Sequence, residues 1–316
     1  MRGILCLRMR VPSFNTKFFT SLSSLAPLQL PSKMETHLWY ASHDDITDKL
    51  VNQYSGLLSP PEKEHVMRMH TYELRRGALL SRALVRTIIA RCVYGSDNQV
   101  NPRSLKFRKN IHGKPELEWP ENNDWNPPEL HFNISHSSSL VACGVTIDCP
   151  IGIDVEDKER KIKHDIMAFA QRYFSQQEKK LLKSISDPEL QRLEFLKLWT
   201  FKEAYVKALG RGFSGAPFRT FTIQSIPNKG GIHPCTKSKS EASEIVVEPL
   251  EDPASHARDW QFSLWELAGS HYAAICTKKD PAISGKRTMK VWKTIPLVSD
   301  EYVSGTDSVL AVGTLM

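Results

Sequence analysis

Residues 188–210 read PELQRLEFLKLWTFKEAYVKALG, and this stretch shows both ends of a long helix. Asp187 precedes it and can accept hydrogen bonds from the free backbone amides of a first helical turn, where Pro188 is also well tolerated. Gly210 suits the left-handed residue that ends a helix. We therefore expect a helix from Pro188 to Leu209.

The apolar side chains of this expected helix form one stripe, and we expect it to face the core: Leu190, Leu193, Phe201, Tyr205 and Leu209. Glu203 and Lys207 lie one turn apart, away from that stripe. A glutamate and a lysine at this spacing often form only an ion pair on the helix surface. Their meaning therefore depends on what the fold places beside them.

Short β-like runs lie on both sides of the expected helix. Those before it are Thr36–Ala41, His131–Ile134, Leu140–Ile147 and Ile151–Val155, and those after it are Thr220–Gln224, Glu244–Val247, Trp260–Glu266 and Tyr272–Thr277. Turn residues between the later runs predict an antiparallel sheet. A second strong helix is expected over residues 71–91, so the fold class is α+β.

Composition indicates a soluble globular protein, since 41% of the residues are hydrophobic. The formal net charge is +7, but five cations precede the first acidic residue, Glu35, so only +2 remains for the rest of the chain. A generic nucleic-acid binder is therefore not supported. No run of about 20 apolar residues is present, so we expect no membrane-spanning helix. The six cysteines lack the spacing of a zinc site and are interpreted as free thiols.

Residues 1–33 are basic, free of acidic residues and rich in hydroxyl side chains, as organellar transit peptides are. A mitochondrial address is the first expectation and a plastid the alternative. A disordered N-terminal tail is the third interpretation, and a form that starts at Met34 would stay in the cytosol.

Two carboxylates are expected on one face of a strand in the run GIDVE, residues 152–156. The alternation of side chains along a strand places Asp154 and Glu156 together, about 7 Å apart. Such a pair repels unless a cation lies nearby, and oxygen ligands of this type suit Mg²⁺. The alternative is an exposed strand end with hydrated acids.

Two further features point to phosphate binding. The run FNISHS, residues 132–137, ends a strand with small hydroxyl residues around His136, although a lone histidine there is more often structural. Arg75, Arg82 and Arg86 share one face of the expected helix over residues 71–91, which is either a solvated face or a cationic patch.

Taken in order, four runs resemble the 4′-phosphopantetheinyl transferases of the surfactin-synthetase-activating type: GKP at 113–115, FNISH at 132–136, GIDVE at 152–156 and WTFKEAYVKALG at 199–210. The resemblance covers the chain from about Trp39 to Thr277. It implies a pseudo-dimeric monomer of two similar α+β halves, with coenzyme A and Mg²⁺, or Mn²⁺ in its place, in the cleft between them. We divide the chain into a leader (1–33), a first half (34–150), a second half (151–278) and an irregular tail (279–316).

The resemblance also implies roles for individual residues. Asp154, Glu156 and Glu203 would hold Mg²⁺ against the pyrophosphate of coenzyme A. Lys114, Ser135 and His136 would belong to the set that binds coenzyme A, with Lys207 beside the same phosphates. Arg82, or a neighbouring arginine, would bind the 3′-phosphate.

The implied reaction is that of a holo-acyl-carrier-protein synthase. It transfers the 4′-phosphopantetheine group of coenzyme A to a serine of an apo-acyl carrier protein and releases 3′,5′-ADP. Glu203 is the candidate general base, and Lys207 would assist the leaving group. With the leader, this predicts a mitochondrial enzyme that serves fatty-acid synthesis. The rival hypotheses are a Mg²⁺-dependent hydrolase of the coenzyme A pyrophosphate and a non-catalytic adaptor for carrier proteins.

Overall fold

The computed structural model describes residues 26–93, 100–119, 129–212, 218–226, 243–249, 256–281 and 287–314. The polar stretch rich in lysine and serine at residues 228–243, whose composition predicts an exposed loop, falls almost entirely outside these ranges. The stretch at residues 120–128, whose composition predicts turns, lies outside them as well.

The first half runs from a buried strand through three α-helices and three short 3-10 segments to two antiparallel strand pairs. Its elements are β1 (Glu35–Ser42), the 3-10 turn η2 (His43–Asp45), α1 (Asp48–Tyr54), η3 (Ser55–Leu57), α2 (Pro60–Met67), α3 (Tyr72–Cys92), η4 (Pro102–Ser104), β2 (Lys106–Lys109), β3 (Pro115–Glu118), β4 (Leu130–His136) and β5 (Leu140–Ile147). Helix α3 carries a buried apolar face, as its spacing predicts.

The second half begins with a strand and holds the longest helix of the described chain. Its elements are β6 (Ile151–Asp157), α4 (Ile166–Tyr173), α5 (Gln176–Ser184), α6 (Pro188–Leu209), β7 (Phe221–Ile226), β8 (Ser243–Pro249), η6 (His256–Asp259), β9 (Trp260–Leu267) and β10 (His271–Lys278). The strands β11 (Thr288–Ile295), β12 (Ser299–Tyr302) and β13 (Val309–Thr314) follow.

Helix α6 has the bounds that its sequence predicts. Asp187 accepts hydrogen bonds from the amides of Glu189 and Leu190, and Gly210 adopts a left-handed conformation with φ of 63°. The prediction that Leu190 faces the core is wrong, because this residue is 59% exposed. It lies in the first turn, beyond the edge of the sheet-facing core.

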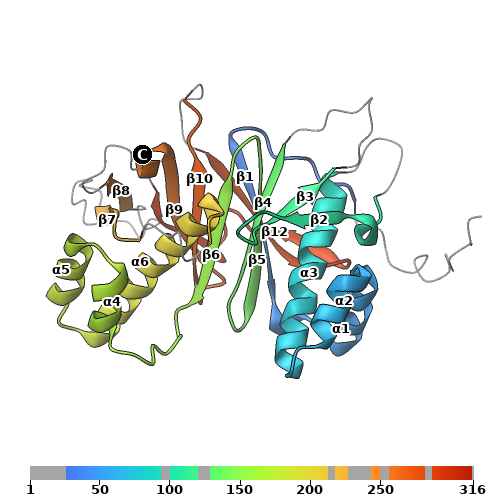
Figure 1. Cartoon of the computed structure of the whole chain (residues 1–316), viewed down its shortest axis with the longest axis horizontal. Helices are drawn as coiled ribbons and strands as arrows, with labels where there is room; N and C mark the ends of the chain where they lie inside the picture. Colours follow the sequence, from blue (N-terminus) through green and yellow to red (C-terminus); the bar gives the residue numbers. More distant parts are fainter. Residues whose placement is uncertain are drawn as a thin grey trace, which may run out of the picture.

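The described strands form two large sheets and a small hairpin. The sheet orders are β12-β11-β1-β5-β4 and β6-β10-β9-β13-β8-β7, and β2 pairs with β3. Figure 1 shows the two sheets in the middle of the molecule, with α1–α3 on the outside of one and α4–α6 on the outside of the other. The α+β fold class with two similar halves is confirmed.

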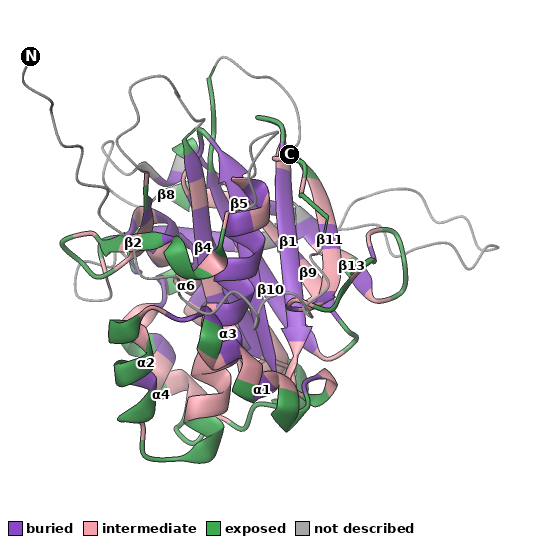
Figure 2. Ribbon diagram, turned by 90° about the vertical axis from the view of Figure 1, so that its right-hand side faces the viewer, coloured by how far each residue is buried: buried purple, intermediate pink, exposed green. Residues whose placement is uncertain are grey.

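The core has three parts that follow this layering. The face of β1 that carries Trp39 and Ala41 packs under α3, while Leu38 and Tyr40 of the same strand face the other sheet. In the second half, Phe201 and Tyr205 of α6 pack on the outer face of its sheet. The central strands are accordingly buried on both faces, as the purple ribbons of Figure 2 show.

The sequence predicts an irregular tail after residue 278, and this prediction is wrong, because the segment contains three strands. Strand β11 lies in the first sheet between the edge strand β12 and β1, with which it pairs in parallel, and β13 enters the second sheet between β8 and β9. Val291 and Val309 are buried in the core between the sheets. The second sheet therefore consists of the antiparallel strands β6, β10 and β9 and the hairpin β7–β8, joined by β13, which runs antiparallel to β9 and parallel to β8.

The expected leader also overlaps the folded part of the chain. The amide of Leu28 donates to the Arg91 carbonyl (3.1 Å), the Arg91 guanidinium donates to the Ala26 carbonyl (2.8 Å), and Lys33 pairs with Asp148 (2.9 Å). Residues 26–33 thus lie on the first half. The described cysteines are buried free thiols, and no described helix has the length and apolar character needed to cross a membrane.

Candidate functional site

The two sheets meet where β4 of the first half lies beside β6 of the second. Side chains of β4 make this junction. The Ile153 amide donates to Asn133 Oδ1 (2.8 Å), and the Val155 amide donates to Ser135 Oγ (3.2 Å). These bonds satisfy amides of β6 that no neighbouring strand pairs. We call this junction the seam.

Helix α6 lies directly on β6 because Gly152 has no side chain. A Cβ atom at this position would be 2.1 Å from the Ala204 carbonyl oxygen and 2.2 Å from the Ala208 nitrogen. Since Ile153 and Val155 face the core between the sheets, the alternate residues Asp154 and Glu156 face the helix. This close approach brings Glu203 and Lys207 over the two carboxylates.

A tight polar cluster joins the two halves at this point. Lys207 Nζ lies 2.6 Å from Asp154 Oδ1 and donates to Ser135 Oγ (2.8 Å), and the Ser135 hydroxyl donates to Asp154 Oδ1 (2.9 Å). Asp154 is only 4% exposed, and its Oδ2 atom is buried without a hydrogen-bond partner. Such an orphaned carboxylate oxygen is costly unless a cation or donor meets it.

The other two carboxylates carry raised pKa values. Burial raises the pKa of Glu156, opposed by its ion pair with Arg160. Burial, with the nearby charges of Asp154 and Glu156, raises the pKa of Glu203 to about 7, opposed by Lys207. The site therefore gathers more negative charge than its lysine and arginine balance, which is typical of functional sites.

The donor chemistry fits a divalent cation, although the side chains are not arranged around one. Among the described residues no three His, Cys, Asp or Glu side chains converge on a common point. Asp154 Oδ1 is turned to Lys207 and Glu156 to Arg160. The orphaned Asp154 Oδ2, with Glu156 and Glu203 beside it, supplies the hard oxygen ligands that Mg²⁺ prefers.

Among basic residues of the first half, His136 lies beside the cluster, and Arg76 is connected to His136 through His43. His136 ends β4 at the surface, where partial burial and the Lys207 ammonium hold its pKa below the usual value. Arg76 of α3 donates to the carbonyls of His43 (3.0 Å) and Ile46. His43 is an electrostatic neighbour of both Arg76 and His136. The sequence analysis missed Arg76, because its place depends on the tertiary contact with η2.

Two predicted phosphate-binding cations lie elsewhere. Lys114 is largely buried, which lowers its pKa to about 8, and its ammonium donates to the carbonyls of Ile151 (2.9 Å) and Ala208 (3.4 Å). It thus holds the β2–β3 hairpin against the end of α6. Arg82 Nη1 donates a hydrogen bond to the Ala78 carbonyl (3.1 Å) of its own helix. Their roles in phosphate binding remain predictions.

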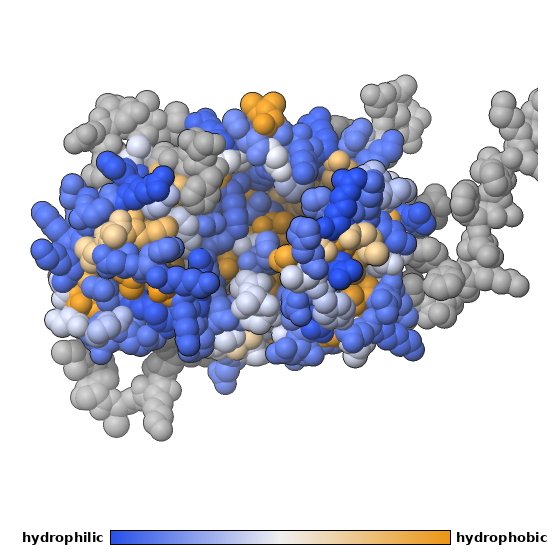
Figure 3. Space-filling model, turned by 60° about the horizontal axis from the view of Figure 1, so that its bottom comes forward, coloured by the Kyte–Doolittle hydropathy of each residue, from blue (hydrophilic) through white to orange (hydrophobic). Residues whose placement is uncertain are grey.

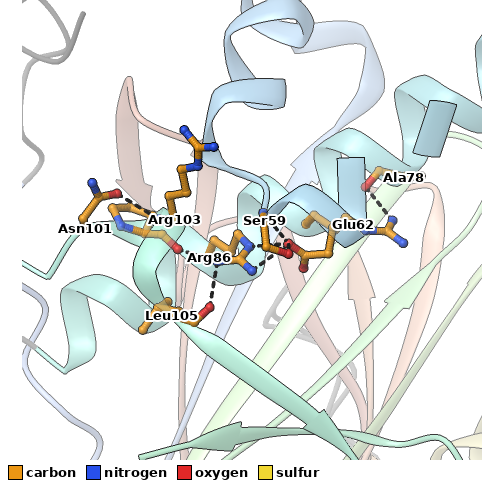
Figure 4. A network of polar contacts seen from close by, with 9 residues as sticks. Ser59, Glu62, Ala78, Arg86, Asn101, Arg103 and Leu105 are labelled. Carbon is orange, nitrogen blue, oxygen red and sulfur yellow. Dashed lines mark hydrogen bonds and ion pairs between the residues drawn. The ribbon is translucent and has the colours of Figure 1, made fainter. Parts of the chain in front are cut away.

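Arg86 is a structural residue rather than part of a cationic face. Figure 4 shows its guanidinium between Glu62, which also accepts from Ser59, and the Leu105 carbonyl. The Arg86 side chain is 2% exposed and pairs with Glu62 at 2.6 Å. The three arginines expected on one face of α3 therefore do not form a common patch.

A second buried ion pair, between Lys202 of α6 and Glu178 of α5, anchors α6 within the second half. Lys202 is fully buried, lies 3.0 Å from Glu178 Oε1, and donates to the carbonyls of Phe218 (2.6 Å) and Phe221 (2.7 Å). The sequence analysis did not identify it, because a lysine inside a helix is usually exposed. Its position fixes the helix turn that carries Glu203.

A cavity of about 330 Å³ opens next to Glu203 in the second half. Aromatic side chains of Phe169, Phe195 and Trp199 line it, and the loop with Arg160, Lys161, Lys163 and His164 forms a basic rim. On the face shown in Figure 3, hydrophobic atoms gather over the half that holds α4–α6, with hydrophilic atoms around them. An apolar floor with a basic rim suits an acidic protein partner.

Comparisons with known proteins agree with this architecture. Residues 150–276 match the model of the 4′-phosphopantetheinyl transferase superfamily, and residues 41–146 match that of the N-terminal region of a 4′-phosphopantetheinyl transferase. The chain is 33% identical to 4′-phosphopantetheinyl transferase HetI of Nostoc sp. over 57% of its length and 70% of that protein. It is 31% identical to 4′-phosphopantetheinyl transferase Sfp of Bacillus subtilis over 54% of its length and 68% of that protein. The mouse L-aminoadipate-semialdehyde dehydrogenase-phosphopantetheinyl transferase is 22% identical over 70% of this chain and 67% of that protein.

The contact at Gly152 predicts a large cost for one added methyl group. Gly152→Ala should lower the free energy of unfolding by about 3 kcal/mol, since the clash is with helix backbone rather than a flexible side chain. Gly56→Ala is the matched control, because a Cβ there meets nothing within 4 Å. Urea titrations of both variants test this, and equal stabilities would contradict the close approach.

The raised pKa of Glu203 predicts a pH-dependent stability in metal-free protein. The folded state holds this proton up to about pH 7, whereas the usual value is 4.5, so the stabilisation is complete below 4.5 and is lost as the pH rises through 7. Glu203→Gln does not titrate. The melting temperature of the variant relative to the wild type should therefore rise between pH 5 and pH 8 in EDTA, and parallel curves would contradict the assignment.

Proposed function

The chain belongs to the 4′-phosphopantetheinyl transferase superfamily, and we propose that it is a holo-acyl-carrier-protein synthase. In this proposal it transfers the 4′-phosphopantetheine group of coenzyme A to a serine of an apo-acyl carrier protein. The observation that carries the proposal is the seam cluster, in which Ser135 of the first half meets Asp154 and Lys207 of the second.

Coenzyme A would bind across the seam with its pyrophosphate above this cluster. Lys207, His136 and the Ser135 hydroxyl supply donors from both halves, and charge-assisted hydrogen bonds to phosphate are among the strongest in proteins. We propose Arg76 as a further cation for the phosphates, because its electrostatic neighbour His43 also adjoins His136. Arg82 and Lys114 are less favoured, because the charged neighbours of Arg82 are Glu62 and Arg86 rather than residues of the cluster, and Lys114 holds the β2–β3 hairpin against the end of α6.

Asp154, Glu156 and Glu203 are the residues that would hold Mg²⁺. The ion would neutralise negative charge on the pyrophosphate when bound there. Arg160 would have to release Glu156 for that carboxylate to take part, since the two form an ion pair in this structure.

The chemistry follows from the side chains around the reacting atoms. The oxygen of the carrier serine attacks the β-phosphorus of coenzyme A, and the bond from that phosphorus to the oxygen of 3′,5′-ADP breaks. Glu203 accepts the serine proton, a role suited to a carboxylate that lines the cavity beside the cluster. Lys207 stabilises the negative charge that develops on the departing 3′,5′-ADP.

The cavity beside Glu203 is the proposed entry for the acceptor. Its aromatic floor can take an apolar side chain of the partner, and its basic rim can attract an acidic surface. These features favour an acidic carrier protein, with the modified serine presented toward Glu203. We further propose that the chain acts as a monomer, because residues of its own two halves complete the site.

Intact-protein mass spectrometry tests the activity. Apo-acyl carrier protein incubated with coenzyme A, Mg²⁺ and this protein should gain one phosphopantetheine group. Asp154→Ala should abolish the gain, and Glu203→Gln should slow it by about 10²–10⁴-fold, as expected for loss of a general base. The control is Glu189→Gln, an exposed carboxylate on the same helix, which should retain the rate.

Each other outcome has a clear meaning. Consumption of coenzyme A without a mass gain would replace the transferase with a pyrophosphate hydrolase. Binding of the carrier without consumption of coenzyme A would favour an adaptor. An unchanged rate for Glu203→Gln would refute the general-base role alone.

We propose a mitochondrial location, with a plastid as the alternative, on the basis of the acid-free basic N-terminal segment. Fluorescent fusions that start at Met1 and at Met34 should differ, because only the longer one carries the segment. Entry of the longer form into an organelle is the expected result. Identical distributions would overturn the proposal.

A further inference from the structure

A buried histidine of the second half contacts the turn that ends β4. His271 opens β10, opposite Asp157 of β6, and is 4% exposed. Its Nε2 lies 2.9 Å from Ser137 Oγ and 3.1 Å from Ser139 Oγ, and its Nδ1 lies 2.8 Å from Ser270 Oγ. Both ring nitrogens are thus satisfied by serine hydroxyls, two of which belong to the first half.

The hydrogen bonds of Ser137 favour one tautomer of this ring. Ser137 Oγ accepts from the amides of Ser139 (3.3 Å) and Leu140 (3.1 Å), which uses its acceptor capacity. Its hydroxyl therefore donates, and of its two acceptors His271 Nε2 (2.9 Å) is nearer than the Leu140 carbonyl (3.4 Å). The shorter contact favours an unprotonated Nε2, with the proton on Nδ1 facing Ser270. Burial also lowers the pKa of His271, which favours the neutral ring.

The same contacts argue against a nucleophilic serine here. Ser137 Oγ is held by two backbone amides and serves as the acceptor of the turn. The third partner of the ring is a serine hydroxyl rather than the carboxylate that orients a catalytic base. The arrangement is therefore one that fixes the backbone of the turn.

This turn directly follows the end of β4 that we propose binds the phosphates of coenzyme A. Ser135 and His136 directly precede Ser137, and the Ser137 amide donates to the Leu140 carbonyl (2.8 Å) to close the turn. On its other side, the His43 amide donates to the Ser139 carbonyl (2.9 Å). His271 is thus the contact by which β10 holds the turn.

We propose that His271 is a positioning residue for coenzyme A, which holds the Ser137–Ser139 turn so that His136 and Ser135 point at its phosphates. The inference rests on the proposed function, because it concerns the affinity of that same site. His271 touches no reacting atom, so its loss should weaken coenzyme A binding and leave the chemical step nearly intact.

Calorimetric titration with coenzyme A and steady-state kinetics with apo-acyl carrier protein test the proposal. His271→Ala should raise the Kd and KM for coenzyme A by about tenfold, with kcat within about threefold. His271→Gln should stay within about twofold, because its amide oxygen can accept from Ser137 as Nε2 does. His271→Asn should resemble the alanine variant, since its shorter side chain reaches only Ser270.

Two further variants separate positioning from a general loss of stability. His37→Gln removes an equally buried histidine, 3% exposed, from β1, and should leave the KM for coenzyme A unchanged. In a His136→Ala background, His271→Ala should cause a smaller loss of affinity than it does in the wild type, because part of its effect passes through His136.

The outcomes are distinguishable from failure of the proposed function. A wild-type protein that neither binds coenzyme A nor modifies the carrier overturns both proposals. A functional wild type whose His271→Ala variant binds coenzyme A normally overturns the positioning role alone. Equal effects of the glutamine and asparagine variants, or full additivity with His136→Ala, overturn it as well, and the glutamine–asparagine pair decides the matter if the alanine variant does not fold.

Discussion

The approach of α6 to β6 at Gly152 is the constraint on which the site depends. Because the helix backbone touches the strand there, Asp154 and Glu156 are buried on the side that faces the helix, and Asp154 pairs with Lys207 of the helix. Lys207 can then reach across the seam to Ser135. On the other side of the helix, the Lys202–Glu178 ion pair anchors it, and both side chains of this pair are fully buried. A glycine and a buried ion pair thus determine where three acidic groups lie.

The helix and the alternation of side chains along the strand could be predicted, because local sequence signals determine them. The contacts between distant elements could not. The cap residues Asp187 and Gly210 mark the ends of α6 in the sequence itself, and strand alternation places Asp154 beside Glu156. By contrast, the role of Arg86 depends on Glu62, which lies on another helix. The carbonyls that hold Lys114 belong to the second half. Neither partner can be recognised from the spacing of residues along one element.

Because side chains of both halves complete the cluster, ligand affinity and the stability of the seam are linked. A ligand that binds only the assembled cluster stabilises the assembled state by mass action. The reverse also holds, since any change that loosens the contact between β4 and β6 lowers the affinity for the ligand. The amide bonds to Asn133 and Ser135 therefore serve the fold and the site together. Ser135 is the clearest case, because its hydroxyl group bonds both to the β6 backbone and to the Asp154–Lys207 pair.

The strands β11 and β13 have a consequence for how this chain acquires its structure. The first strand of the fold, β1, takes its parallel partner from β11, and the second sheet is interrupted until β13 lies between β8 and β9. Contacts this distant in sequence are slow to form, because a long loop must close before they are gained. During synthesis on a ribosome, neither sheet can be completed until nearly the whole chain has emerged. The unpaired edges of β1 and β9 would be exposed in that interval, and exposed strand edges are prone to pair with other chains.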